Sequence, residues 1–148
     1  MGAGVIHIRL TRKEGWEQRL YALIEARRDM PFAWGENDCL MFAADCILTM
    51  TGVDPTAEWR GYSDEAEAKR RLAEYCGSAN LVSAAYKYLG HPTTHVRNAR
   101  RGDLVAYARR DWPMFGVVTL DGMHFATPSA SGLAFYALEN ASLAWRIG

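Results

Sequence analysis

The sequence predicts an α+β fold in which helices come first and an antiparallel β-meander of about five strands follows. Residues 11–90 carry apolar side chains at helical spacing, with capping residues before the runs and glycines after them. Residues 101–148 carry short β-type runs separated by turn residues. Because helical and strand runs do not alternate along the chain, we expect the helices to pack against one face of the sheet.

One domain is expected to span residues 1–148, with a helical half at 11–90 and a β half at 101–148. Its composition is that of a globular protein, with 49% hydrophobic and 23% charged residues. The formal net charge of +0 argues against nucleic acid as the main partner, since phosphate binding needs a net or clustered positive field. No apolar run approaches the roughly 18 residues that a membrane span needs, so no span is expected.

Four helices are expected, at residues 14–28, 38–51, 64–76 and 81–89. Asp38, Ser63 and Asn80 are the expected N-caps, because short polar side chains accept hydrogen bonds from the free N–H groups of a first helical turn. Gly52 and Gly77 follow two of the runs, where glycine favours the left-handed conformation that ends a helix. The helical half therefore carries its own start and stop signals.

Five strands are expected, at residues 104–108, 115–120, 123–126, 133–137 and 143–147. Asp121-Gly122, between the second and the third, is a two-residue hairpin signal. Residues 5–10 alternate weakly between apolar and polar side chains and predict a short strand or an extended arm. Four large aromatic side chains of the β half are expected in the core: Trp112, Phe115, Phe135 and Trp145.

The chain has three cysteines, an odd number, and Met1–Gly4 opens no secretory signal. We therefore expect free thiols in the reducing cytoplasm. Cys46 falls on the apolar face of its helix and is expected in the core, whereas Cys76 ends a helix and is expected to be exposed. The sequence has no paired-cysteine spacing of the zinc type, so no metal site and no cofactor is expected.

Cys39 is the candidate nucleophile because it stands in the first turn of an expected helix. Unpaired N–H groups and the positive end of the helix dipole stabilise a thiolate at such a position. Asp38 is expected to cap this helix and not to act as a base. Trp34 and Gly35 lie in the loop before the helix, and Trp34 is expected to wall the cleft beside the thiol. A cysteine hydrolase also needs a base and a group that orients the base.

The residues around Cys39 resemble those of the NlpC-like cysteine peptidases, a papain-like group that cleaves bacterial cell-wall peptides. Phe32–Gly35 and Asp38–Phe42 are similar to the Tyr-x-x-Gly and Asp-Cys-Ser-Gly-Phe of that group. Arg101–Val105 is similar to the Gly-Asp-Leu-Val that opens its first strand, and Gly116–Val118 is similar to part of its central hairpin. The resemblance implies a papain-like, NlpC-like fold.

A branch of this superfamily found in phages and prophages, often near tail genes, is the closer match. It shares Trp-Gly-x-x-Asp-Cys, a Thr-Gly-x-Asp-Pro after the helix (Thr51–Pro55), a Gly-Asp strand start and a terminal Ala-Trp-Arg (Ala144–Arg146). Members of this branch have no settled function. The resemblance implies partners among the hub or tip proteins of a phage tail, and cell-wall peptide as a further candidate ligand. It also implies a protein made in the bacterial cytoplasm and incorporated in the virion tail.

The resemblance places the base of these peptidases at Met114, two residues before Gly116, and the third polar group at Ala126 on the next strand. A thioether cannot take a proton from a thiol, and a methyl group cannot orient an imidazole. The resemblance therefore implies a degenerate catalytic centre in a structural or assembly component of the tail tip.

His124 is an alternative base, and two interpretations of it stay open. It shares a strand face with Ala126, so a shifted register would bring it towards Cys39. The protein would then be an active cysteine hydrolase that cleaves cell-wall peptide bonds with Cys39 as nucleophile. In the other interpretation His124 lies at the sheet edge or packs on a polar face, because register is firmly set where one strand face is buried. A third hypothesis is a module that binds a small ligand or a metal in the same cleft, with Cys39, Cys46 and His124 as the metal ligands.

Five arginines flank the first expected strand and are candidate docking residues: Arg97, Arg100, Arg101, Arg109 and Arg110. In one interpretation they form a solvated rim that is offset by acids such as Asp103 and Asp111. In the other they form a docking surface for an acidic partner, since arginine is enriched at protein interfaces. The sequence leaves both interpretations open.

Overall fold

The computed structural model describes residues 8–110 and 112–148 and has the expected α+β architecture. The helices are α1 (Trp16–Arg27), α2 (Cys39–Thr51), α3 (Glu65–Cys76) and α4 (Leu81–Leu89), with the short 3-10 helices η1 (Val96–Asn98) and η2 (Leu138–Asn140). The strands are β1 (Leu104–Arg109), β2 (Trp112–Val118), β3 (His124–Ser129), β4 (Gly132–Ala137) and β5 (Leu143–Trp145). None of the helices in the described ranges is long and apolar enough to cross a membrane.

The five strands form one antiparallel sheet in the order β4-β3-β2-β1-β5, so that β2 lies at its centre. The connection between β2 and β3 is longer than the expected two-residue turn. Thr119 N–H donates to the carbonyl of His124 at 2.9 Å, which leaves residues 120–123 in the loop. Gly122 still takes a positive φ of 72° within this loop, as the hairpin signal requires.

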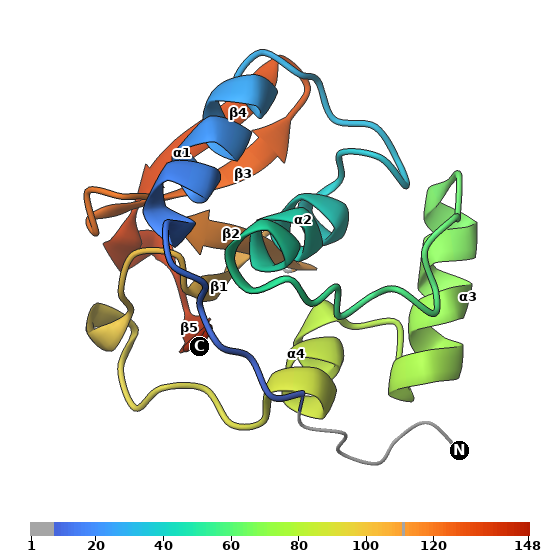
Figure 1. The fold of residues 1–148 in the computed structure, drawn as a ribbon. Coiled ribbons are helices and arrows are strands. Elements are labelled where there is room, and N and C mark those ends of the chain that lie inside the picture. Colours follow the sequence, from blue (N-terminus) through green and yellow to red (C-terminus); the bar gives the residue numbers. More distant parts are fainter. Residues whose placement is uncertain (1–7, 111) are drawn as a thin grey trace.

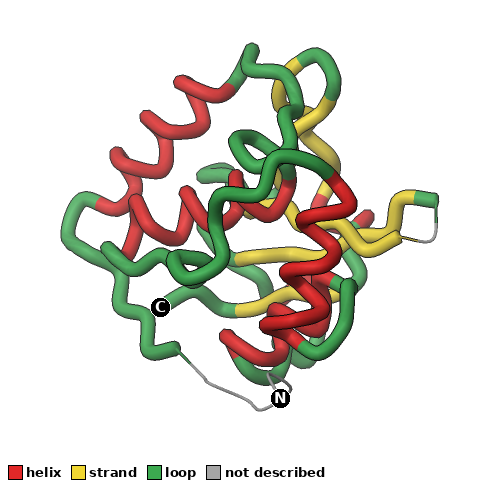
Figure 2. The backbone as a smooth tube through the Cα atoms, turned by 90° about the vertical axis from the view of Figure 1, so that its right-hand side faces the viewer, coloured by secondary structure: helices red, strands yellow, loops and turns green. Residues whose placement is uncertain are grey.

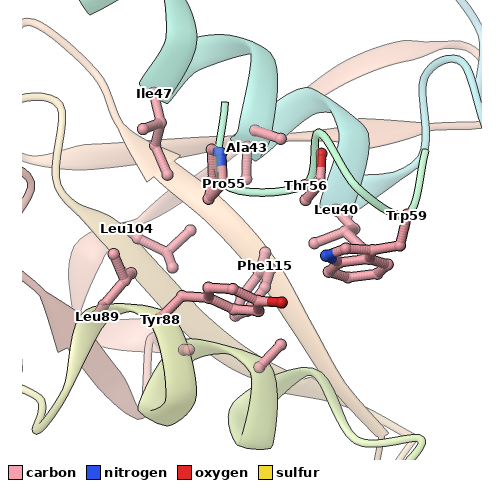
Figure 3. A pocket seen from close by; sticks show the side chains of 13 residues that line it. Leu40, Ala43, Ile47, Pro55, Thr56, Trp59, Tyr88, Leu89, Leu104 and Phe115 are labelled. Carbon is pink, nitrogen blue, oxygen red and sulfur yellow. The ribbon is translucent and has the colours of Figure 1, made fainter. Parts of the chain in front are cut away.

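Helix α2 is the centre of the core and lies over the sheet, with α1 on one side of it and α4 on the other (Figure 1). Most of its side chains are buried for this reason. A cavity of about 30 Å³ remains between α2, α4 and the sheet, where Leu40 and Ile47 of α2 lie across from Tyr88 of α4 (Figure 3). Its lining is mainly apolar, so it is a packing gap in the core.

The opposite face of the sheet carries a second, smaller cluster around Val105, Tyr107, Val118 and Phe125. The segments that contain η1 and η2 cover this cluster, with Ala99 packed directly into it. The middle of the sheet is therefore buried by helices on one face and by short connecting segments on the other.

The expected residues stand at the helix ends, with one correction. Asp38 and Asn80 cap α2 and α4 through their side chains, and the glycines after α2 and α3 take left-handed conformations. The cap of α3 is Asp64 and not the expected Ser63. The Asp64 carboxylate accepts from Glu67 N–H at 2.8 Å, whereas Ser63 donates its own N–H to the Glu67 carboxylate at 3.1 Å. Asp64 is the cap because α3 begins one residue later than expected, at Glu65, which places Ser63 outside the helix.

Three side chains of the described residues lie elsewhere than expected. Trp112 is 56% exposed and Phe135 is 38% exposed, although Phe115 and Trp145 are buried as expected. Trp112 is exposed because β2 already begins there and pairs with the end of β1, so that the two strands project as a ribbon (Figure 2). Cys76, expected at the surface, is buried.

Residues 8–10 of the expected N-terminal strand or arm are not in a strand. The segment starts at the end of α4, where Ile8 N–H donates to the carbonyl of Tyr88 at 2.8 Å. The rest of that prediction, residues 5–7, lies outside the described residues.

Candidate functional site

Cys39 opens onto a groove with a volume of about 470 Å³, which we call the Cys39 groove. It runs between the start of α2, one side of α3 and the β1–β2 ribbon. Its walls are mainly apolar and aromatic and include Phe32, Trp34, Leu72, Trp112 and Met114. Besides the helix cap Asp38, the charged side chains along it are Glu65, Lys69, Arg109 and Arg110. The groove therefore offers apolar surface with charged groups beside it.

Asp38 is committed to structural hydrogen bonds at the start of α2. One carboxylate oxygen accepts from Met41 N–H at 2.8 Å. The other accepts from Gly35 N–H at 2.8 Å and from the Tyr62 hydroxyl at 2.6 Å. Burial raises the pKa of Tyr62, and the Asp38 charge acts in the same direction, so the phenol remains a donor. Asp38 therefore fixes both the helix start and the loop before it.

Gly35 allows the loop before α2 to pass close to the segment that follows α2. Its φ is 78°, and a Cβ at this position would lie 1.9 Å from the Tyr62 carbonyl oxygen, so only glycine fits. This close approach brings Trp34 to the wall of the Cys39 groove, where its ring meets that of Phe32 edge-on at 4.9 Å between centroids. The loop thus positions two rings of the groove.

A chain of ion pairs ties the segments around α2 to that helix. Asp45 of α2 accepts from Arg27 of α1 and from Arg60, both at 2.5 Å. Arg27 also donates to Asn37 at 3.0 Å, and Arg60 donates to Asp54 at 2.5 Å. The loops before and after α2 are therefore held to one side chain of the helix.

Cys39 is 5% exposed, and burial raises the pKa of its thiol from the ordinary 9.0 to about 12. The charge of Asp38 acts in the same direction, whereas backbone hydrogen bonds at Phe115, Cys39 and Leu40 lower the pKa. A helix start is expected to stabilise a thiolate and so to lower the pKa. Here the effect of burial on the pKa is the larger of the two. The thiol is therefore protonated at neutral pH.

Met114 lines the Cys39 groove, and in the sheet it pairs with Tyr107 of β1. Ala126 pairs with Val117 and is fully buried in the core on the α2 side of the sheet. The positions at which the resemblance places a base and its orienting group thus carry a thioether in the groove and a methyl group in the core. Neither side chain can accept a proton from a thiol.

His124 lies in a different hollow, of about 370 Å³, between α1 and the loop that joins β2 to β3. Its Nδ1 is 2.6 Å from Asp121 Oδ2, and its side chain is 44% exposed. Tyr21 and Glu25 of α1 line the same hollow, which shares no lining residue with the Cys39 groove. The structure does not bring His124 to the groove, because the sheet register directs it towards α1.

The other described histidines and cysteines also lie outside the Cys39 groove. His91 packs edge-on against Tyr86, and His95 is exposed in the loop after α4. Cys46 and Cys76 are buried free thiols. Within residues 8–110 and 112–148, no three His, Cys, Asp or Glu side chains gather in a group that could hold a metal ion. The hypothetical metal module is therefore not assembled by these residues.

The five candidate docking arginines lie in three separate places. Arg109 and Arg110 line the Cys39 groove. Arg101 pairs with a glutamate of α1 at 3.7 Å. Arg97 and Arg100 line a further hollow beside β5. One cluster in the sequence is therefore not one surface in the fold.

Sequence reasoning missed three residues that shape the Cys39 groove: Tyr62, Lys69 and Trp112. Tyr62 holds Asp38, as described above, and Lys69 Nζ lies 4.5 Å from the centre of the Trp112 ring. Helical spacing puts Lys69 on the same face as Glu65, with which it pairs at 3.1 Å. That local signal does not tell what the helix face meets, so it could not have identified the groove.

Comparison with known proteins supports the fold and identifies the family. The chain is similar to the solved structure of the NlpC/p60 domain of the peptidoglycan hydrolase SagA, with a TM-score of 0.56 and 15% sequence identity. The match covers 88% of this chain and 98% of that chain, and at this identity it shows the fold alone. No match was found among curated proteins. The model of the family described as "Domain of unknown function (DUF6950)" matches residues 11–147, so the chain belongs to that family.

Proposed function

We propose that this protein binds an extended segment of a partner protein in the Cys39 groove and does not cleave it. The lining of the groove carries the proposal. Cys39 and Met114 share the groove with aromatic walls, and none of the described residues that line it is a histidine. A thiol without an adjacent base is a poor nucleophile at neutral pH.

The groove has the chemistry of a peptide-binding surface. Trp34 and Trp112 are 39% and 56% exposed, and rings that combine large area with few rotatable bonds are common anchors at interfaces. Lys69 lies over the Trp112 ring, and it and its partner Glu65 supply a donor and an acceptor in the same groove. An extended segment can place apolar side chains between the rings and its polar groups on the charged pair.

The setting that we propose is the tail tip of a phage or prophage. This chain would be a structural or assembly component there, made in the bacterial cytoplasm and incorporated in the virion tail, with a hub or tip protein as its partner. Support comes from the ordered set of short motifs, which are Trp34–Cys39, Thr51–Pro55 and Ala144–Arg146.

The alternative function is an active cysteine hydrolase that cleaves cell-wall peptide with Cys39 as nucleophile. One observation favours it, since Cys39 stands at the first turn of α2 within a groove, where backbone hydrogen bonds of Cys39 and Leu40 oppose the rise in thiol pKa that burial causes. N–H groups at a helix start can also stabilise an oxyanion. This function needs a base that the described residues do not place in the groove.

Digestion of purified peptidoglycan separates the two functions. We expect neither the wild type nor Cys39→Ala to release new amino groups above the protein-free blank. Release by the wild type that is lost in Cys39→Ala would establish the hydrolase instead. Unfolding midpoints of both proteins show whether the variant is folded.

Particle composition tests the binding function and its setting. Tail particles purified from the producing strain should contain the protein, and Trp34→Ala with Trp112→Ala should reduce its incorporation. Tyr21→Ala is the matched control, because Tyr21 is 57% exposed but lies outside the groove. Particles that lack the protein, together with normal tails in a deletion strain, would contradict the tail setting.

A further inference from the structure

A second surface, distinct from the Cys39 groove, is a hollow of about 520 Å³ that gathers three arginines from two distant parts of the sequence. Arg97 and Arg100 come from the segment around η1, and Arg146 follows β5 directly. Thr94 and Asn98 add a hydroxyl and an amide, and none of the lining residues is acidic. We call this surface the arginine hollow. In Figure 1 the short yellow helix η1 lies on the left and α3 of the groove on the right.

The guanidinium groups of the arginine hollow form no ion pair with the described residues. All three side chains are exposed, and no carboxylate of the described residues lies within ion-pair distance of them. Two nearby arginines do have carboxylate partners, since Arg12 pairs with Asp103 and Arg101 pairs with Glu17. Burial lowers the pKa of Arg12, and the charges of Arg101 and Arg146 act in the same direction. Positive charge is thus concentrated at this end of the sheet and only partly neutralised.

The backbone on both sides of the arginine hollow is fixed by Asp103, which is 0% exposed. One carboxylate oxygen accepts from Arg100 N–H at 2.9 Å. The other accepts from Ile147 N–H at 3.0 Å and from the Arg12 guanidinium at 2.9 Å. These bonds hold the residue next to Arg146 and the backbone of Arg100 in one unit. A backbone that is ordered in advance lowers the entropy cost of binding a partner.

We propose that the arginine hollow is a docking site for an acidic segment of a protein partner, whose Asp or Glu carboxylates are bound by Arg97, Arg100 and Arg146. A guanidinium group binds a carboxylate through two parallel N–H bonds, which gives both energy and direction. The hollow suits a chain segment because it is open to solvent and its three charges come from two separate stretches of the chain, one around η1 and one after β5.

Nucleic acid fits the same surface less well. Proteins that bind single strands combine a basic groove with aromatic rings on which the bases stack, and the lining of the arginine hollow has no aromatic residue. The net charge of the chain is +0, so there is no wider positive field to attract a phosphate backbone. The acidic segment is therefore the occupant to test.

The test measures binding of a labelled synthetic peptide with six Asp and Glu residues spaced by glycine and serine, by fluorescence anisotropy at low and moderate salt. Arg97→Gln with Arg146→Gln should weaken binding by about tenfold or more. Arg19→Gln with Arg70→Gln removes the same charge from exposed residues outside the hollow and should change affinity by less than about twofold. Binding to the wild type should weaken as salt increases.

Three results would overturn the proposal: no binding of the peptide to the wild type, equal losses in both double variants, or tighter binding of single-stranded DNA of equal charge. Urea unfolding shows whether the variants are folded, and exposed arginines should leave the midpoint unchanged. Arg97→Lys serves as a milder variant because it keeps the charge and removes the paired N–H donors. A several-fold loss is expected from it, and wild-type affinity would count against the bidentate contact.

Discussion

The Cys39 groove and the arginine hollow are built in the same way but present opposite chemistry. A buried aspartate fixes the backbone of each, Asp38 at the groove and Asp103 at the hollow, with 2% and 0% exposure. The groove presents aromatic rings and a protonated thiol, whereas the hollow presents three exposed guanidinium groups. Binding in the groove should therefore depend on apolar burial, and binding in the hollow on charges that salt screens.

The largest expected effect comes from removing the aspartate beneath the hollow. Asp103→Ala leaves the partly buried Arg12 without its counter-ion and two backbone N–H groups without an acceptor. The free energy of unfolding should fall by about 3–5 kcal/mol, as measured by urea unfolding. The control Asp29→Ala, at an exposed position, should change it by less than about 0.5 kcal/mol. Equal losses in the two variants would contradict the role given to Asp103.

At the groove, the close approach of two loops can be tested by itself. Gly35 and Gly15 have similar φ values of 78° and 77°, but only at Gly35 would a Cβ collide with backbone. Gly35→Ala should destabilise the fold by roughly 1–3 kcal/mol more than Gly15→Ala. Both variants place an alanine at a positive φ, but only Gly35→Ala also brings its Cβ against backbone. Thermal unfolding measures the difference. Equal destabilisation would mean that the loop carrying Trp34 shifts without cost.

The thiol of the groove gives a prediction about reactivity. Because burial raises the pKa of Cys39 to about 12, its alkylation by iodoacetamide at pH 7.5 should be slower than that of free cysteine. The rate should rise with pH, and unfolding in urea should remove the protection. Mass spectrometry of the peptide that contains Cys39 measures the rate. Alkylation faster than that of free cysteine would favour the hydrolase.

The raised pKa of the Cys39 thiol also predicts that the stability of the fold depends on pH. In the unfolded chain the Cys39 thiol ionises above its ordinary pKa of 9.0, whereas in the folded chain it stays protonated up to about 12. The unfolded state therefore binds fewer protons in this window, and stability should fall as the pH rises through it. Cys39→Ala should show a smaller fall between pH 8 and pH 10. An equal fall in both proteins would place the effect on other groups.

The smallest effect is expected from His124→Ala. His124 is 44% exposed, lies outside the groove and pairs with Asp121, so stability should change by less than about 0.5 kcal/mol. Alkylation of Cys39 should be unchanged, with His95→Ala as an exposed control. A loss of Cys39 reactivity in His124→Ala alone would show that His124 affects the reactivity of the Cys39 thiol.

Much of the fold could be predicted because its signals are local. Apolar spacing and caps gave the helices to within two residues, and the strands were found because each run is bounded by turn residues. Two exceptions are also local. Asp64 and not its neighbour Ser63 caps α3, and the β2–β3 loop is longer than Asp121-Gly122. The candidate site was predictable only in part. Cys39 and Trp34 lie in one continuous motif, whereas Tyr62, Lys69 and Trp112 reach the groove from other parts of the chain.

By itself, the sequence determined the α+β class, the helix that begins at Cys39 and the absence of a proton acceptor at Met114. Each of these depends on residue type and on neighbours within a few positions. The tertiary structure decided that the Cys39 thiol is buried and that Trp112 and Lys69 line the groove. It also placed Arg97 and Arg146 in one hollow and Arg109 in the groove. Burial and the meeting of distant side chains follow from packing and strand order, which no short stretch of sequence specifies.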